Sequence, residues 1–456
     1  MPSPRLPAHR LWTLASLLAL IVWTAAAAAA AQSRAIAVTN VTVIDGTGAP
    51  PRADLTVVID GNRISAIGRT ADVVVPAGAQ QVDGRTKFLI PGLWDMHVHL
   101  GAYADGARTL PRLAAYGITG VRDMASPIDD VLRLRRATAA GTVVGPQIVA
   151  AGPILQPPLP FPPSPAMRTV TSTDARATVA ELQAKGVDFI KVGDVLPRET
   201  YLLLAEEARR LGLPLAGHLP PFVPAAEAAQ AGHRSIEHFG SAYFRGVLLA
   251  CSRDETRLTG IVRGVLTATL AGGASPEREL NRAEFVNALV DSYDSGKAAT
   301  LFESFVKNGT WQVPTLAILR VVWDQQRKQL NEQDAAALDR LWTRTLEMFA
   351  DMRAHGVKVL AGSDMGLGPG VPPLHDELVA LVRAGLTPLQ AVRTATRDAA
   401  EFLGRLDAEG TLEVGKKADA VLLDADPSTD IANTRRVSAV VLNGRLISDA
   451  ELQRLR

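Results

Sequence analysis

Short apolar runs that end at turn residues mark both ends of the chain. The dipeptides Asp60-Gly61 and Asn443-Gly444 each follow such a run, and both are strong signals for a tight β-hairpin. The runs are 38–44, Leu55–Ile59, Ala420–Leu423 and Val437–Leu442. We therefore predict a small β-sandwich domain built from both chain ends, residues 32–87 and 409–456.

Between these ends, short apolar runs alternate with patterns typical of amphipathic helices. Eight runs are read as strands: Leu89–His99, Thr119–Met124, Gln147–Pro153, Phe189–Val192, Leu215–His218, Ile236–Phe239, Val313–Ile318 and Val357–Gly362. Eight strands with intervening helices predict an α/β fold, a (β/α)₈ TIM-like barrel over residues 88–408. One helix start is well marked, since Thr387-Pro388-Leu389-Gln390 is a capping box with proline at the first helical position and Gly404 follows the last turn.

Two stretches interrupt this alternation. The segment Gln156–Pro165 is rich in proline and predicts a stiff, extended loop after the third strand. The segment Gly240–Gly309 is much longer than an ordinary connection between a strand and a helix, so we expect extra helices there.

The first 31 residues have the layout of a secretory signal peptide. Arg5 and Arg10 lie in a basic start, Leu11–Trp23 is apolar, and Ala29-Ala30-Ala31 offers a cleavage site before Gln32. The apolar run is shorter than the ~20 residues of a membrane span, although the following alanines leave an uncleaved anchor as an alternative. We expect an exported chain, periplasmic or extracellular, with no stable membrane association after cleavage.

Composition narrows the class of protein. Hydrophobic residues make up 47% of the 456 residues and charged residues 21%, which suits a globular protein with a sizeable core. The net charge of +1 gives no electrostatic case for nucleic acid or an anionic membrane as partner. Cys251 is the single cysteine, so no internal disulfide forms, and we expect it to be buried.

The sharpest chemical signal is His97-Val98-His99 at the end of the first barrel strand. Residues two apart on a strand point to the same side, so two imidazoles can chelate one metal ion without strain. Active sites of barrels lie at the carboxyl ends of strands, where this motif lies.

Four more polar residues lie in or at the ends of later strands: Lys191, His218, His238 and Asp364. Each has an ordinary alternative: a core histidine for His218 and His238, a helix cap for Asp364, and a rim ion pair with Asp194 for Lys191. A lysine inside an apolar strand is costly unless it is paired or modified. Together with His97 and His99, these residues predict a metal site.

Other polar residues carry weaker signals. Arg122 and Tyr243 lie at or just after strand ends and are candidates for binding a substrate carboxylate, with structural roles as the alternative. We expect His375 either at the mouth of the barrel or in a structural role, and His233, which ends a helical pattern, at the surface.

The chain resembles the amidohydrolase superfamily almost end to end after the signal peptide. The resemblance is carried by the Pro-Gly-x-x-Asp-x-His-x-His pattern ending at His99, by Ser363-Asp364 and by Leu412-Glu-Val-Gly-Lys-Lys-Ala-Asp419. Gly117-Ile-Thr-Gly-Val-Arg-Asp123 and Ser235-Ile-Glu-His238 resemble the branch of imidazolonepropionase-like proteins and metal-dependent Xaa-Pro dipeptidases. The proline-rich Gln156–Pro165 departs from the glycine- and histidine-containing loop of that branch.

The resemblance implies a ligand set for two divalent metal ions, with zinc favoured by the imidazoles. His97, His99 and Asp364 are implied on the first ion, and His218 and His238 on the second. Lys191 is implied as a carbamate, formed with carbon dioxide, that bridges both ions. Asp364 is implied as the catalytic residue that accepts the proton of the attacking water.

The expected function is hydrolysis of a C–N bond in a small molecule, such as an N-acyl amino acid or an Xaa-Pro dipeptide. A cyclic amide or lactone as substrate is the enzymatic alternative. A catalytically silent binding protein that keeps the barrel is the alternative of another class, and metal analysis separates it from the enzymes. The sequence leaves a homo-oligomer open.

Overall fold

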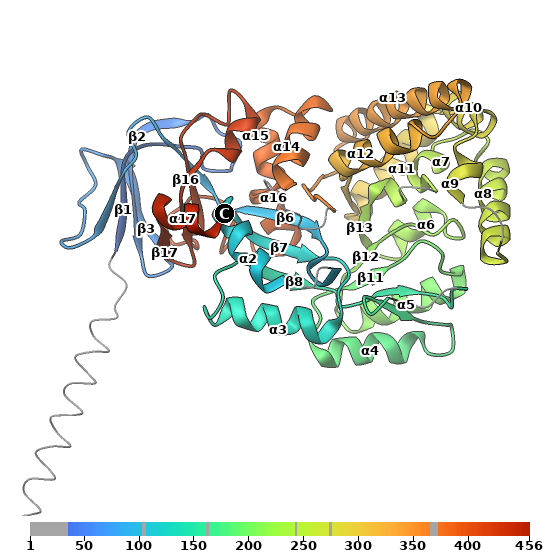
Figure 1. Ribbon diagram of the computed structural model, residues 1–456, viewed down its shortest axis with the longest axis horizontal. Helices are drawn as coiled ribbons and strands as arrows, with labels where there is room; N and C mark the ends of the chain where they lie inside the picture. Colours follow the sequence, from blue (N-terminus) through green and yellow to red (C-terminus); the bar gives the residue numbers. More distant parts are fainter. Residues whose placement is uncertain (1–34, 103–105, 161–163, 242–243, 273–275, 365–372) are drawn as a thin grey trace, which may run out of the picture.

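The computed structural model describes residues 35–102, 106–160, 164–241, 244–272, 276–364 and 373–456. The expected signal peptide and Tyr243 lie outside the described residues. No helix among the described residues is long and apolar enough to cross a membrane. The remaining chain forms a sheet at one end and an α/β body with parallel sheets at the other (Figure 1).

Both chain ends contribute to one eight-stranded sheet, as the hairpin signals predict. Its strands run in the order β17-β16-β15-β5-β1-β2-β3, and β4 pairs with β1. The bounds are β1 Ile36–Val43, β2 Arg52–Asp60, β3 Arg63–Arg69, β4 Gln80–Asp83, β5 Phe88–Pro91, β15 Ala420–Leu423, β16 Val437–Leu442 and β17 Arg445–Ile447. Both hairpins form, with Asn443 and Gly444 at φ 51° and 77°. The two ends are joined where β15 pairs antiparallel with β5.

The chain passes from this sheet into the body at Gly92. We expected one strand over Leu89–His99, whereas the structure divides it into β5 and a separate strand, β6, over Leu93–Val98. A Cβ atom at position 92 would come within 2.1 Å of Thr119 Oγ1. The close packing against Thr119 therefore requires glycine at this position.

Nine strands form the two parallel sheets of the body. One sheet has the order β6-β7-β8 and the other β10-β9-β11-β12-β13-β14. Their bounds are β7 Ile118–Asp123, β8 Gln147–Ala150, β9 Ile154–Gln156, β10 Met167–Thr169, β11 Ile190–Val192, β12 Leu215–Gly217, β13 His233–Glu237 and β14 Trp311–Val313. Two short strands were not expected: β9, which ends at Gln156 where the proline-rich segment begins, and β10, which follows that segment and pairs with β9.

Two of the expected strands differ from the structure. The run Val313–Ile318 is not a strand over its length, because β14 ends at Val313 and helix α12 begins at Leu316. The run Val357–Gly362 has no named strand and only one bridge, between Val359 and Gln312.

Backbone hydrogen bonds nevertheless place this last run between the two sheets. On one side Gln312 N donates to Lys358 O, and Leu360 N donates to Gln312 O. On the other side Met96 N donates to Ala361 O. At the opposite junction, Asp188 N donates to Ala150 O over 2.8 Å.

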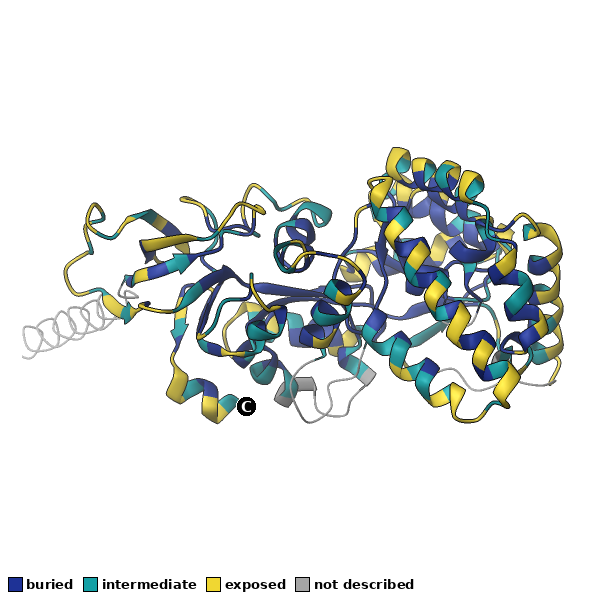
Figure 2. Ribbon diagram, turned by 90° about the horizontal axis from the view of Figure 1, so that it is seen from above, coloured by how far each residue is buried: buried dark blue, intermediate teal, exposed yellow. Residues whose placement is uncertain are grey.

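Helices cover the outside of these strands and keep their exposed faces toward solvent (Figure 2). The expected insertion between β13 and β14 is helical: α7 Gly246–Ala250, α8 Glu255–Leu270, α9 Pro276–Leu280, α10 Ala283–Asp291 and α11 Ser295–Asn308. The capping box of Thr387 is present and begins α15. The other helices are α2 Gly106–Ala115, α3 Ile128–Ala139, α4 Ala175–Lys185, α5 Arg198–Arg210, α6 Ala225–Gln230, α12 Leu316–Arg327, α13 Glu332–Ala354, α14 Leu374–Arg383, α15 Pro388–Thr394, α16 Arg397–Phe402 and α17 Asp449–Leu455, with short 3₁₀ turns at Leu100–Ala102, His238–Gly240 and Ile431–Arg435.

Candidate metal centre

The carboxyl ends of the parallel strands bring three of the expected ligands together. His97 lies on β6, His99 follows it, and Asp364 ends the run that lies beside β6. Asp364 Oδ1 is 3.1 Å from His97 Nε2 and 2.9 Å from His99 Nε2. One ligand atom from each residue lies within 4.8 Å of the other two, which is compact enough for a single cation.

Two further histidines extend this group from the neighbouring sheet. His238 follows β13, and its Nε2 is 3.5 Å from Asp364 Oδ2. The rings of His97 and His238 are 4.8 Å apart between centroids, and those of His238 and His218 are 5.3 Å apart. Asp364 therefore lies between the histidines of the two sheets, with one oxygen toward each side.

Each of the four imidazoles has its Nδ1 atom near an acceptor of the protein. His97 Nδ1 is 2.7 Å from Glu237 Oε2, and His218 Nδ1 is 2.9 Å from Asp194 Oδ2. The other two contacts are neutral: His99 Nδ1 with Ala125 O at 3.3 Å, and His238 Nδ1 with Thr315 Oγ1 at 2.6 Å. A neutral imidazole that donates through Nδ1 keeps its lone pair on Nε2, which is the form that binds a metal.

Lys191 supplies the unusual feature of the site. Its side chain on β11 is buried, and its Nζ atom has no hydrogen-bond partner among the described residues. Burial lowers the pKa of Lys191, although the negative charges of Glu237 and Asp364 oppose this effect. The expected alternative, an ion pair with Asp194, is wrong, because the carboxylate of Asp194 faces His218 instead.

The backbone is strained at the positions that aim these side chains. His238, Thr315 and Asp364 have positive φ angles of 55°, 49° and 51°, which residues other than glycine rarely adopt. Such conformations cost about 1–3 kcal/mol each and are found where the surrounding structure holds a functional geometry. All three follow strand ends, where the chain turns and directs the side chain across the site.

The charges of the site favour bound cations. Burial alone would raise the pKa of Asp364, but His97, His99 and His238 hold it well below its ordinary value. Burial lowers the pKa of His238 to about 3, so its imidazole is neutral at pH 7. Among the described residues, the buried Nε2 of His97 has no hydrogen bond of acceptable geometry despite its 3.1 Å distance from Asp364. An ionised carboxylate beside a neutral imidazole and an orphaned nitrogen fits a divalent metal ion.

The buried carboxylate of Asp95 joins β6 to the run that ends at Asp364. Asp95 Oδ1 accepts from the backbone of His97 at 3.2 Å and of Ser363 at 2.9 Å, while its Oδ2 accepts from Ser363 Oγ at 2.7 Å. Burial raises the pKa of Asp95 to about 6. The sequence motif contained Asp95, but its positioning role follows only from these contacts.

The weaker expectations have separate outcomes. Arg122 is buried, and its guanidinium donates to Met96, Ser235 and Glu237, so the structural alternative accounts for it. His233 is not at the surface: it is buried on β13 between Tyr201 Oη and the carbonyl of Gly217.

His375 does not line the mouth. It is buried between Thr434 Oγ1 and the carbonyl of Tyr116, and burial lowers its pKa to about 4. Cys251 is buried, as expected.

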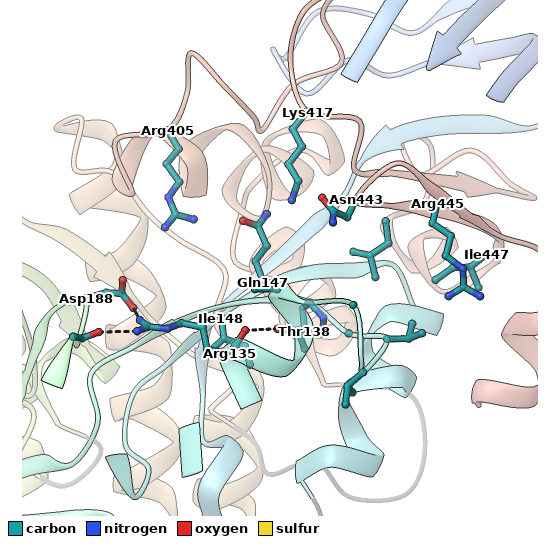
Figure 3. Close-up of a pocket in the computed structure, with 18 residues that line it drawn as sticks. Arg135, Thr138, Gln147, Ile148, Asp188, Arg405, Lys417, Asn443, Arg445 and Ile447 are labelled. Carbon is teal, nitrogen blue, oxygen red and sulfur yellow. Dashed lines mark hydrogen bonds and ion pairs between the residues drawn. The ribbon is translucent and has the colours of Figure 1, made fainter. Parts of the chain in front are cut away.

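A cavity of about 700 Å³ lies elsewhere, between α3, β8 and the sheet of the chain ends. Figure 3 shows Arg405, Lys417 and Asn443 on one side of it and Arg135 on another. Two of its cations are already paired, Arg135 with Asp188 and Lys417 with Asp419, both at 2.7 Å. Because it contains none of the clustered histidines and lies near the start of β8, we do not assign the chemistry to it.

The family model for the amidohydrolase family matches residues 88–447. The chain belongs to the amidohydrolase family. It is a hydrolase that acts on carbon–nitrogen bonds, and its family is metal-dependent. The match covers all six candidate ligand residues, and the superfamily resemblance carried by the sequence motifs is confirmed.

Individual relatives agree with this membership. Ochratoxinase of Aspergillus niger is 25% identical over 434 residues, covering 87% of this chain and 83% of the relative. A segment of 83 residues is 39% identical to imidazolonepropionase of Mesorhizobium japonicum, covering 17% of this chain and 20% of that protein.

Solved structures show the same fold. A Xaa-Pro dipeptidase with bound methionine gives a TM-score of 0.67 at 21% identity, covering 91% of this chain and 100% of that one. The crystal structure of the ochratoxinase gives 0.68 at 21% identity, covering 92% and 96%.

Proposed function

We propose that this amidohydrolase uses two divalent metal ions to hydrolyse an amide or peptide bond of a small molecule. One observation carries the proposal: the Nε2 atoms of His97, His99 and His238 lie at the strand ends within 3.5 Å of the Asp364 carboxylate. His218 lies beside His238, and the buried amine of Lys191 has no hydrogen-bond partner among the described residues. His97, His99 and Asp364 would hold the first ion. His218 and His238 would hold the second, with zinc favoured by the imidazoles.

Lys191 would bridge the two ions as a carbamate. The neutral amine forms an N–C bond with carbon dioxide and releases one proton, which changes a repelling ammonium into a carboxylate-like bridge. The burial of Lys191 and the lack of a partner for its Nζ among the described residues support this chemistry. An unmodified amine there would satisfy none of its hydrogen-bonding capacity with those residues.

The residues of the chain then perform the proton transfers. When bound, the metal ions supply the Lewis acidity that polarises the scissile carbonyl and lowers the pKa of water. Asp364 lies between the two sets of histidines, so its ionised carboxylate accepts the proton of the attacking water. The same carboxyl group delivers that proton to the leaving nitrogen when the C–N bond breaks.

We also propose the finer architecture. Hydrogen bonds on both sides of the run 357–364 and at Asp188 support closure of the two parallel sheets into a (β/α)₈ barrel over residues 88–408. Residues 32–87 and 409–456 would form a β-sandwich domain. Residues 1–31 would be a signal peptide, so the mature chain would start near Gln32 outside the cytoplasm; N-terminal sequencing of the native protein that returns Met1 would contradict this.

We propose an N-acyl amino acid or an Xaa-Pro dipeptide as the substrate class. The ochratoxinase likeness over most of both chains and the dipeptidase among the structural neighbours support it. The shorter likeness to imidazolonepropionase favours a second candidate, opening of a cyclic amide or a lactone.

A substrate screen tests the proposal. The purified protein is loaded with zinc in bicarbonate buffer, its metal content is measured, and N-acyl amino acids, Xaa-Pro dipeptides, cyclic amides and lactones are offered. We expect about two metal equivalents per chain and turnover in the first two classes. Turnover of cyclic substrates alone would support the second candidate, and folded protein without metal or turnover would support a silent binding protein.

A further inference from the structure

A buried arginine connects the two parallel sheets directly beneath the metal centre. Arg122 lies on β7, and its Nε donates to the carbonyl of Met96 on β6 at 2.7 Å. Its Nη1 donates to Ser235 Oγ at 2.8 Å, and its Nη2 donates to Glu237 Oε1 at 2.9 Å. Both acceptors lie on β13, in the other sheet (Figure 1).

The carboxylate of Glu237 divides its two oxygens between this arginine and the site. Ser235 Oγ donates to Glu237 Oε1 at 2.6 Å, so Oε1 accepts from both Arg122 and Ser235. The other oxygen, Oε2, is 2.7 Å from Nδ1 of His97. Arg122, Ser235, Glu237 and His97 are all buried, so water does not compete for these donors and acceptors.

From these contacts we infer that Arg122, Ser235 and Glu237 form a positioning relay that fixes the tautomer and ring orientation of His97. The relay rests on the proposed metal function. With Oε1 occupied by two donors, the carboxylate turns a bare oxygen toward Nδ1 of His97, and that nitrogen must be the protonated one. The lone pair of His97 then stays on Nε2, toward Asp364 and the metal.

The alternative is that Arg122 and Glu237 are only an ion pair that stabilises the body. Removal of either partner from such a pair destabilises a protein because a charge is left buried. If the pair is purely structural, every variant that removes a partner should be less stable. The metal affinity of the folded protein should then be unchanged.

The substitution Glu237→Gln separates these readings. An amide cannot accept on both sides: if its oxygen faces Arg122 and Ser235, its NH₂ group faces His97 Nδ1. That arrangement favours the wrong tautomer, with hydrogen on Nε2. We expect the folded variant to bind zinc about 10–100-fold more weakly in a chelator competition, and the cobalt-loaded variant to change its visible absorption spectrum.

A second substitution should reverse part of this loss. In Glu237→Gln/Arg122→Met the NH₂ group can turn toward Ser235, whose hydroxyl can accept, and the amide oxygen is free to accept from His97. Methionine fits between Phe189 and Phe402, which now flank the guanidinium at 5.5 and 5.2 Å. We expect the double variant to bind zinc several-fold more tightly than Glu237→Gln.

Controls keep the outcomes distinct. Arg245→Met removes another buried arginine, which contacts Leu280 and Asn281 rather than the site, and should leave the zinc affinity unchanged. If either Glu237 variant fails to fold, Ser235→Ala decides, with an expected several-fold loss of zinc affinity. Unchanged affinity in Glu237→Gln or in Ser235→Ala, or no recovery in a folded double variant, overturns the relay. Absence of zinc from the wild-type protein refutes the proposed function instead.

Discussion

Replacing Lys191 with methionine should stabilise the metal-free protein while it removes the function. The Lys191 amine is buried and has no partner among the described residues. When the metal-free chain folds, this amine therefore loses its hydrogen bonds to water and gains none from those residues. An unsatisfied buried polar group costs about 1–3 kcal/mol. Methionine has a similar length and no polar head, so we expect the free energy of unfolding of the metal-free protein to rise by about that amount.

The pH dependence of this gain has a definite sign. The pKa of Lys191 is lowered in the folded protein, so below pH 10.5 the unfolded chain binds more protons at this residue than the folded chain. The wild-type protein therefore loses stability as the pH falls, down to the folded pKa, while methionine does not titrate. The advantage of Lys191→Met should be larger at pH 7 than at pH 10.

The assay is denaturant unfolding of chelator-treated protein, with and without added zinc and bicarbonate. Zinc and bicarbonate should stabilise the wild type more than Lys191→Met, because the variant lacks the bridge. Lys358→Met is the control; Lys358 is about half exposed and pairs with Glu401, so its removal should change stability by only about 0–1 kcal/mol. If metal-free Lys191→Met is less stable than wild type and keeps both metal equivalents, Lys191 is an ordinary structural lysine and the carbamate reading is refuted.

The remaining predictions concern the rest of the site and two buried histidines. His97→Ala should remove most bound metal and nearly all hydrolysis, measured by metal analysis and turnover; full metal and full activity would show the site to be elsewhere. Lys191→Ala should lose activity and regain part of it with a short carboxylic acid, which can occupy the vacated bridge; an equal response of the wild type to the acid would show that it acts elsewhere. Gly362→Ala would place a Cβ 2.7 Å from His97 Cβ and 2.6 Å from Val313 Cγ1. We therefore expect a stability loss of about 1–3 kcal/mol and weaker metal binding. The control is Gly260→Ala, which has open space among the described residues and should not weaken metal binding. Burial lowers the pKa values of His233 and His375 to about 4, so between pH 6.5 and 4 the unfolded chain binds more protons than the folded chain. Stability should therefore fall as the pH falls through this range, by about 3 kcal/mol for each residue. In metal-free protein His375→Gln should flatten the slope of stability against pH, and an unchanged slope would contradict the assignment.

The sequence predicted the candidate ligands because their signals are local. A His-x-His pair at a strand end and single polar residues that close apolar runs require no knowledge of distant contacts. The acceptors that hold the imidazoles were missed for the opposite reason. Glu237, Asp194 and Thr315 contact histidines from other elements, and only the packed strands bring them together.

The error at His233 has a related cause. On β13 the polar residues His233, Ser235 and Glu237 occupy alternate positions, and all three are buried. Alternation of apolar and polar residues normally indicates which side faces solvent. Here the polar side faces the interior beneath the candidate metal centre. His233 was expected at the surface because it ends a helical pattern, whereas in the structure it begins the buried strand β13. The run Val357–Gly362 was located correctly, but its hydrogen bonds alternate between two neighbours and form only a single bridge.

The pairing of β5 with β15 has a consequence for how the chain folds. The strands made first, β1 to β5, leave the edge of β5 unpaired until residues 420–423 arrive, after the whole body has been synthesised. An exposed strand edge is a template for pairing with other chains. His99 and Asp364, 265 residues apart, likewise meet only near the end of synthesis. A chain shortened at its carboxyl end should therefore aggregate through β5, even if the candidate metal ligands are all present.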